Sequence, residues 1–144
     1  QVTWLLDRKF YSVSSAVPEG TKVVFTQVGA NDPNFNLRNE PGFMYRAKTS
    51  DGIAVVSVIE PHGDYNPTVE YTLGSHSQVK IVSHFESGAD EYIEIQTKDG
   101  NIVGLGLGAG TDESAEHSVD VNGKTVSWTG PYKLFQSQAH LDAK

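Results

Sequence analysis

The sequence predicts an all-β fold, an antiparallel β-sandwich with jelly-roll-like connections that forms a single domain. Of the 144 residues, 46 are Val, Ile, Thr, Phe, Tyr or Trp, which favour strands, against 18 Ala, Leu and Met. The apolar segments are short and are bounded by Gly, Pro or Ser. No window of about 11 residues carries the apolar stripe of a helix, so helices are not expected.

The expected strands follow one another along residues 1–135, which we take as the sandwich domain. The strand at 53–60 is nearly continuous in apolar residues, so it should lie mid-sheet and be covered on both faces. Asp99-Gly100 and Asn122-Gly123 each separate two short strands and favour tight hairpin turns. Residues 136–144 form a polar tail that is too short for a stable helix. The strands are expected at residues 2–6, 22–28, 53–60, 79–85, 92–97, 102–107, 119–121 and 124–128.

One long stretch, residues 29–42, is dense in Asn, Gly and Pro and is expected to be irregular. It also carries the apolar residues Phe35 and Leu37. A loop of this length in a compact domain is usually functional or packs on itself, which makes it a candidate binding loop.

Composition and charge exclude several classes of function. The chain has no Cys, which excludes disulfide frameworks, thiolate zinc sites and cysteine nucleophiles. Its net charge of -7 repels phosphate backbones, so nucleic acid is not an expected partner. No apolar stretch approaches the roughly 20 residues that a membrane span needs. The only Met is Met44, so we expect either a piece of a longer protein or a chain processed by signal-peptide removal.

Glu60, His62 and Asp64 alternate after the most apolar strand, so in an extended chain their side chains point the same way. Carboxylates and an imidazole in that arrangement can bind a metal ion or act as a general base. The alternative is structural: Pro61 ends a strand, Gly63 allows a turn and His62 bonds a nearby backbone carbonyl. Short motifs are seldom specific, and this favours the structural alternative.

Two further groups are candidates for binding a sugar. Asn36 and Arg38 can offer an amide and a guanidinium to a sugar or uronate, although Asn-rich loops more often bond their own backbone. Large aromatic side chains can form a stacking platform for sugar rings, although most aromatics in a β domain belong to its core. The aromatic candidates are Trp4, Tyr65, Tyr71 and Trp128.

Two other patterns are given structural interpretations. The acidic segment 112–116 lacks the spacing of oxygen ligands that calcium loops use, so we interpret it as a solvated loop. The glycine-rich segment 104–110 ends without the Lys or helix start of a phosphate loop. Its glycines are expected to let a strand bend or approach another backbone closely.

Three segments carry a resemblance to a known family: Trp4 to Ser12, Gly29 to Arg38, and above all Val56 to Pro67. With them, most of residues 4–135 is similar to the C-terminal β region of heparinase II/III-like polysaccharide lyases. Within that group the chain most resembles the oligoalginate lyases of polysaccharide lyase family seventeen.

The resemblance implies a parent enzyme with an N-terminal (α/α) toroid and a following β-sheet, which cleaves uronate-containing polysaccharide by β-elimination. In that family the Asn, His and Tyr groups that act on the substrate lie largely on the toroid and the preceding sheet. We therefore expect an accessory C-terminal domain that is not catalytic by itself, with no catalytic residue, metal ligand or cofactor of its own.

The expected partners are the toroid and sheet of the parent lyase and an acidic polysaccharide, and the expected location is periplasmic or secreted. The rival interpretation is a free-standing carbohydrate-binding module for acidic polysaccharide. The candidate carbohydrate-binding residues are Asn36, Arg38, Glu60, His62 and Tyr65.

Overall fold

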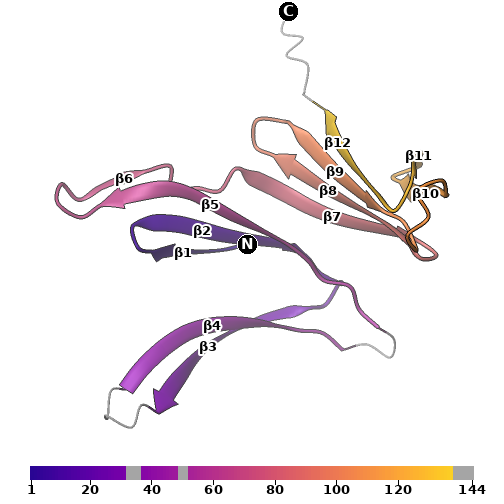
Figure 1. Cartoon of the computed structure of the whole chain (residues 1–144). Coiled ribbons are helices and arrows are strands. Elements are labelled where there is room, and N and C mark those ends of the chain that lie inside the picture. The colour runs from indigo at the N-terminus through magenta and orange to yellow at the C-terminus, as the bar shows by residue number, and fades with distance from the viewer. Residues whose placement is uncertain (32–36, 49–51, 138–144) are drawn as a thin grey trace, which may run out of the picture. The chain divides into compact units, whose positions relative to one another are not determined.

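The computed structural model describes residues 1–31, 37–48 and 52–137, and this part of the chain is built of antiparallel strands (Figure 1). The predicted all-β, antiparallel fold class is confirmed. No helix among the described residues has the length and apolar character needed to cross a membrane. The strands are β1 (Val2–Leu6), β2 (Lys9–Ala16), β3 (Lys22–Asn31), β4 (Leu37–Arg46), β5 (Val56–Asn66), β6 (Tyr71–Leu73), β7 (Val79–Ser87), β8 (Asp90–Thr97), β9 (Ile102–Leu107), β10 (Glu116–Val121), β11 (Lys124–Thr129) and β12 (Tyr132–Ser137).

The chain divides into two compact units. One unit comprises Gln1–Ala16 with Val56–Lys144, and the other comprises Val17–Val55. Strand β12 continues to Ser137, two residues into the segment expected as a tail, and residues 138–144 lie outside the described part. The division into a domain at 1–135 and a tail at 136–144 therefore stays a prediction.

The smaller unit is a long hairpin of β3 and β4, paired from Lys22 with Arg46 to Asn31 with Leu37. The expectation of an irregular stretch over 29–42 is wrong for its described residues, because both flanks of that stretch are strand. Cross-strand backbone bonds outweigh the turn preference of the Asn and Gly residues there. Pro41 lies in a two-stranded sheet, in which alternate N–H groups of each strand point away from the partner strand, and proline in strands is confined to such edge positions.

In the larger unit, one sheet has the strand order β1-β2-β5-β6. Strand β5 lies between β2 and β6, as expected of a central strand, but it begins at Val56 rather than Ile53. Its residues alternate between half-buried and exposed, and Ile59 is 65% exposed, so the expected cover on both faces is wrong for the described residues. A continuous apolar run does not by itself require two covered faces.

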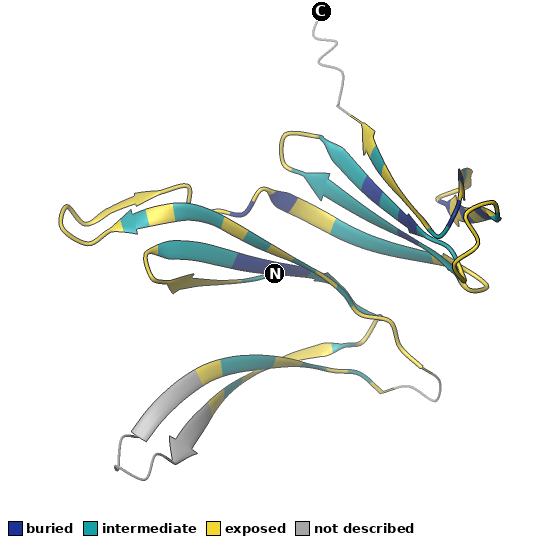
Figure 2. Cartoon of the chain, in the orientation of Figure 1, coloured by how far each residue is buried: buried dark blue, intermediate teal, exposed yellow. Residues whose placement is uncertain are grey.

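The second sheet has the order β12-β9-β8-β7, and the β10–β11 hairpin packs on one of its faces. The core lies between these two layers, and Figure 2 shows its buried positions on β9, β10 and β11. The predicted turn at Asn122-Gly123 is confirmed, since Val121 pairs with Lys124. The core residues are Tyr92, Val119, Val121 and Trp128, with Phe85, Val126 and Phe135 packed against them.

The glycines of β9 make room for the rings of this core. A Cβ on Gly106 would lie 2.8 Å from the Trp128 ring, and one on Gly104 would lie 2.7 Å from the ring carbon Cζ of Tyr92. Both distances are too short for a real contact, so only glycine fits at these positions. The glycine-rich segment is therefore structural, as predicted, and the close approach is to side chains rather than to backbone.

Candidate functional site

Glu60 and His62 lie on the same face of β5, and both hold the connection between β6 and β7. Ser77 Oγ donates to one Glu60 carboxylate oxygen, and the Gln78 amide donates to the other at 3.0 Å. His62 Nδ1 lies 2.8 Å from the carbonyl oxygen of Gly74, and its Nε2 lies 2.8 Å from Ser12 Oγ. A carbonyl only accepts, so Nδ1 carries the proton.

The pKa of the Glu60 carboxyl is lowered, although burial by itself would raise it. The hydrogen bonds from Ser77 and Gln78 outweigh the burial, and the nearby His62 adds a smaller lowering. Glu60 is therefore held as an ionised carboxylate that accepts hydrogen bonds. This state suits a structural anchor, whereas a general acid must carry a proton.

Asp64 does not join Glu60 and His62. Its carboxylate lies 3.0 Å from Lys9 Nζ in a solvent-exposed ion pair. Gly63 has a φ of 55°, and the register between β2 and β5 shifts at Lys9, which redirects the strand after His62. Among the described residues no group of three His, Asp or Glu side chains lies close enough to hold a metal ion. The structural alternative for His62, a bond to a nearby backbone carbonyl, is the arrangement observed.

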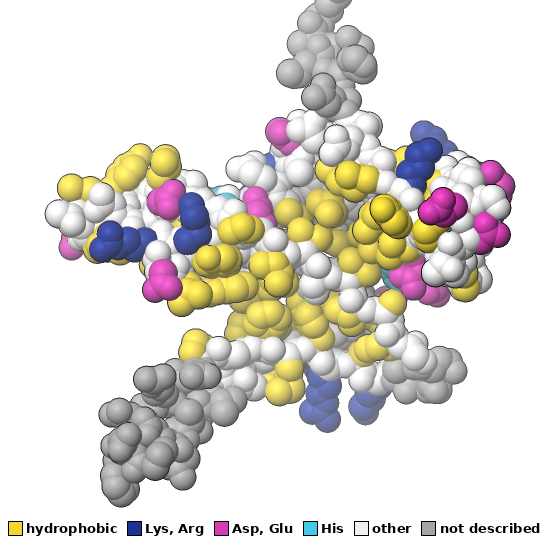
Figure 3. All heavy atoms as spheres, viewed as in Figure 1, with side chains coloured by type: hydrophobic (Ala, Val, Ile, Leu, Met, Phe, Trp, Pro, Cys, Tyr) yellow, Lys and Arg dark blue, Asp and Glu magenta, His cyan; other side chains and the backbone are white. Residues whose placement is uncertain are grey.

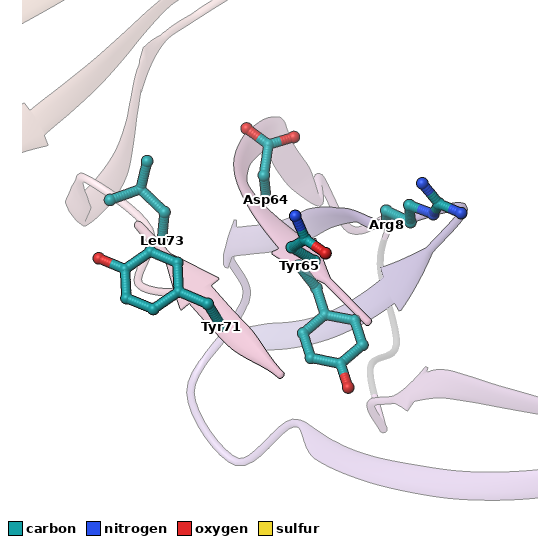
Figure 4. Close-up of a pocket in the computed structure, with 6 residues that line it drawn as sticks. Arg8, Asp64, Tyr65, Tyr71 and Leu73 are labelled. Atoms are coloured by element: carbon teal, nitrogen blue, oxygen red, sulfur yellow. The ribbon is translucent and has the colours of Figure 1, made fainter. Parts of the chain in front are cut away.

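A hollow of about 280 Å³ lies at the end of the β1-β2-β5-β6 sheet, where the β1–β2 turn meets the β5–β6 hairpin. The backbone amide of Tyr65 donates to the carbonyl of Arg8 at 2.8 Å and ties the β1–β2 turn to β5. In Figure 4, Tyr71 and Leu73 lie on one side of the hollow and Arg8 on the other. Its lining residues are Arg8, Asp64, Tyr65, Asn66, Tyr71 and Leu73.

Sequence reasoning found Tyr65 and Tyr71 but missed Arg8 and Asn66. The sequence does hold a signal for Arg8: the two residues Asp7-Arg8 join apolar segments, in the place where an Asp-Gly turn is usual. Both have positive φ, 47° for Asp7 and 70° for Arg8, as the favoured two-residue hairpin turn demands.

The other sequence candidates fall elsewhere. Asn36 lies outside the described residues. Arg38 lies on β4 opposite Ala30, and the placement of its side chain is likewise outside the description. Of the aromatic candidates, Trp128 is buried in the core and Trp4 stacks on Tyr11 with ring centroids 5.8 Å apart. The carbohydrate-binding role of Asn36, Arg38, Glu60, His62 and Tyr65 stays a prediction.

A second polar group, which the sequence did not suggest, joins β8 to β10. His117 Nδ1 lies 2.8 Å from Asp90 Oδ1, and its ring stacks on Trp128 at 5.7 Å. The Ala109 amide also donates to Asp90, at 3.2 Å. That hydrogen bond lowers the pKa of Asp90 most, burial opposes it, and the bond and charge of His117 add to the lowering. Neither the hollow at Arg8 nor the one at Lys80 and Lys98 is lined by this pair, and its contacts are those of a structural tie between strands.

The molecular face in Figure 3 carries basic side chains in small, separate groups, with acidic side chains between them. A continuous basic surface of the kind that follows a polyanion is not visible on this face. Recognition of an acidic ligand on this face would depend on individual cations rather than on a broad positive field.

The comparisons with known proteins identify relatives. Residues 97–135, which run from the end of β8 into β12, match the family described as exo-oligoalginate lyase-like, C-terminal domain. The chain is 35% identical over 141 residues, 98% of its length, to an alginate lyase of Stenotrophomonas maltophilia. It is 34% identical over 133 residues, 90% of its length, to an exo-oligoalginate lyase of Saccharophagus degradans.

The chain spans 18% of the length of each of these relatives. The family match covers Gly106, Val119, Trp128 and Phe135, and so includes most of the core described above. The longer similarities also include most of the segments that carried the resemblance in the sequence. The expected resemblance to oligoalginate lyases is confirmed: residues 97–135 match the C-terminal domain of the exo-oligoalginate lyase-like family, and nearly the whole chain is similar to a part of two alginate lyases.

Proposed function

We propose that this chain is an accessory C-terminal β domain of an alginate lyase and does not break the glycosidic bond itself. The observation that carries this proposal is the similarity of 98% of the chain to 18% of an alginate lyase. A segment of that size leaves most of such an enzyme, including room for an (α/α) toroid and a further sheet, in the remainder of the relative.

The chemistry of β-elimination supports the same assignment. The reaction needs a group that neutralises the uronate carboxylate, a base for the C5 proton and an acid for the leaving oxygen. In the described residues, His62 is committed to Gly74 and Ser12, while His117 is buried against Asp90. No histidine lines the hollow at Arg8, so no described imidazole is placed there as a base or an acid.

The surface of the β1-β2-β5-β6 sheet supports a partner within the same enzyme. The register places Trp4, Leu6 and Ile59 on one face, and all three are exposed. Several exposed apolar side chains on one face of a sheet are characteristic of a surface that another domain covers. We propose that the toroid and preceding sheet of the parent lyase cover this face, and that a uronate polysaccharide is the shared substrate.

Two measurements test the proposal. The purified chain should produce no unsaturated uronate from alginate, followed by ultraviolet absorbance, and measurable elimination would refute the accessory role. In the Saccharophagus degradans enzyme, deletion of the matching segment should lower the melting temperature and the activity. Replacing that segment with this chain should restore both, and a chimera no better than the deletion would contradict the proposal.

A free-standing carbohydrate-binding module is the rival, and the hollow at Arg8 is the observation that favours it. The chimera separates the two functions, because a free module would bind alginate without rescuing the deleted enzyme. We also propose a periplasmic or secreted location, which follows from the parent enzyme. Fractionation of the native source should recover the protein outside the cytoplasm, and recovery in the cytoplasm would contradict this.

A further inference from the structure

We propose that the hollow at Arg8, Asn66 and Tyr71 binds one uronate residue of an acidic oligosaccharide. Arg8 would hold the sugar carboxylate, Asn66 would donate to a hydroxyl, and Tyr71 would stack on the ring. The ligand class rests on the proposed function, while the site itself rests on geometry and charge.

The fold brings the three side chains to one hollow from two turns. Asn66 and Tyr71 are directly paired across β5 and β6, so their side chains share a face of that hairpin. Arg8 comes from the β1–β2 turn and is fixed by the hydrogen bond between its carbonyl and the Tyr65 amide. In Figure 4 Tyr71 and Arg8 lie on opposite sides of Asp64 and Tyr65, and all four residues line the hollow.

The charge at the hollow favours an anion. Arg8 makes no ion pair or side-chain hydrogen bond with any described residue. The N–H donors of its planar guanidinium are therefore available to bind a carboxylate. Asp64, the acid in the lining, is neutralised by Lys9 at 3.0 Å. The local balance of these three groups is therefore positive, in a chain whose net charge is -7.

The polar and apolar parts of the hollow match a sugar. The Oδ1 of Asn66 accepts from the Thr68 amide at 3.0 Å, which orients the side chain and leaves its NH₂ group as the donor. The Tyr71 side chain is 59% exposed and offers a ring face for the C–H side of a pyranose. A volume of about 280 Å³ is at the lower end of ligand pockets and suits a single sugar ring.

The backbone at Arg8 is a further sign that its side chain is used. Gly123, at the corresponding second turn position of the β10–β11 hairpin, has a φ of 81°. Arg8 adopts 70° at such a position, where a side chain is disfavoured relative to glycine. Residues held in such conformations concentrate at binding sites.

A second hollow does not offer the same combination. It has a volume of about 350 Å³ and includes Lys80 and Lys98, but no aromatic ring. Its Gln1 side chain is already bonded to Ser14 at 2.6 Å. A cation without a stacking surface is a weaker match to a sugar acid, so the hollow at Arg8 is the site we assign.

The test is calorimetric titration of the chain with a mannuronate trisaccharide, with amide NMR shifts to locate the binding. Arg8→Ala should weaken binding by about 10-fold to 100-fold, the loss expected for a charged hydrogen bond. Tyr71→Ala should weaken binding comparably, while Tyr71→Phe keeps the ring and should change it by less than about 3-fold. Arg46→Ala removes the same charge from β4 and is the matched control, which should bind as the parent chain does.

Two further probes make the outcome decisive. Arg8→Gly removes the guanidinium at a position that glycine prefers, so a loss of binding in this variant is not a loss of folding. The neutral mannose trisaccharide of the same linkage should not bind, because the carboxylate is absent. Equal binding of both sugars, no binding of either, or binding unchanged by Arg8→Ala and Arg8→Gly would each overturn the proposal.

The experiments distinguish failure of this binding site from failure of the proposed accessory role. A chimera that regains lyase activity while the hollow binds no oligouronate would leave the accessory role intact and remove the binding site. Elimination by the isolated chain would instead remove the accessory role, and the titrations would still decide the site.

Discussion

His117 Nδ1 on β10 lies 2.8 Å from Asp90 Oδ1, so the first residue of β8 fastens the hairpin that covers the core. Asp90 also accepts from the amides of Ala109 and Ser118, at 3.2 and 3.4 Å. One carboxylate therefore joins the start of β8, the segment after β9 and the β10–β11 hairpin. Protonation of that carboxylate would weaken all of these contacts together.

Acid should accordingly destabilise this hairpin through Asp90. The Ala109 amide, opposed by burial and supported by His117, lowers the pKa of Asp90 below its ordinary value of 3.8. The stabilisation that ionised Asp90 provides is therefore fully present above its ordinary pKa. It is lost as the pH falls through the lowered pKa of the folded state. Melting temperatures measured from about pH 6 to pH 2 should fall more steeply for the parent chain than for Asp90→Asn. Parallel curves would contradict the role of Asp90.

Gly106→Ala should destabilise the larger unit by about 1–3 kcal/mol, the usual cost of forcing an atom into a packed core. The new Cβ would lie 2.8 Å from the Trp128 ring, which is 2% exposed and has little space to move. Urea unfolding followed by Trp fluorescence measures the change. Gly52→Ala is the control, because a Cβ at that residue would meet no atom within 4 Å, and it should change stability by less than about 0.5 kcal/mol.

Glu60→Gln should loosen the connection between β6 and β7. The amide replaces a carboxylate that accepts from Ser77 and Gln78, and the cost should be about 1–3 kcal/mol. Hydrogen exchange at the Gln78 and Val79 amides should accelerate. Asp64→Asn breaks only the exposed pair with Lys9 and should cost no more than about 1 kcal/mol. Equal effects of the two substitutions would contradict an anchoring role for Glu60.

Arg8→Gly should stabilise the chain by about 0.5–1 kcal/mol, because the turn after β1 requires a positive φ at this position. The substitution would complete an Asp-Gly pair, which is a preferred sequence for a two-residue hairpin turn. Thermal unfolding should show a higher melting temperature in Arg8→Gly and an unchanged one in Arg8→Lys. A lower melting temperature in Arg8→Gly would mean that the guanidinium makes a structural contact.

Much of the fold could be predicted from local patterns. The turn at Asn122-Gly123 and the strands on either side depend on residues close in sequence, and the structure confirms them. The long hairpin of β3 and β4 could not be predicted, because cross-strand bonding rather than composition decides the conformation of its Asn and Gly residues. The exposure of Ile59 could not be predicted either, since a buried and an uncovered apolar strand have the same sequence pattern.

The candidate site, too, could be predicted only in part from the sequence. The alternation of Glu60 and His62 predicted that they share a face, but only the three-dimensional fold brings Ser77 and Gly74 to them and makes them anchors. Arg8 reaches the Asn66–Tyr71 hairpin through a contact between residues distant in sequence, Tyr65 N with Arg8 O. No local pattern specifies such a meeting of two turns.

The close packing beside Gly104, Gly106 and Gly108 restricts which substitutions this interior can accept over time. The rings of Tyr92, Trp128 and His117 occupy the space that side chains at 104, 106 and 108 would fill. A larger residue at one of those positions is tolerated only if the facing ring becomes smaller in the same lineage. Paired replacements, such as Gly106→Ala with Trp128→Phe, should therefore be less harmful than the sum of the two single changes.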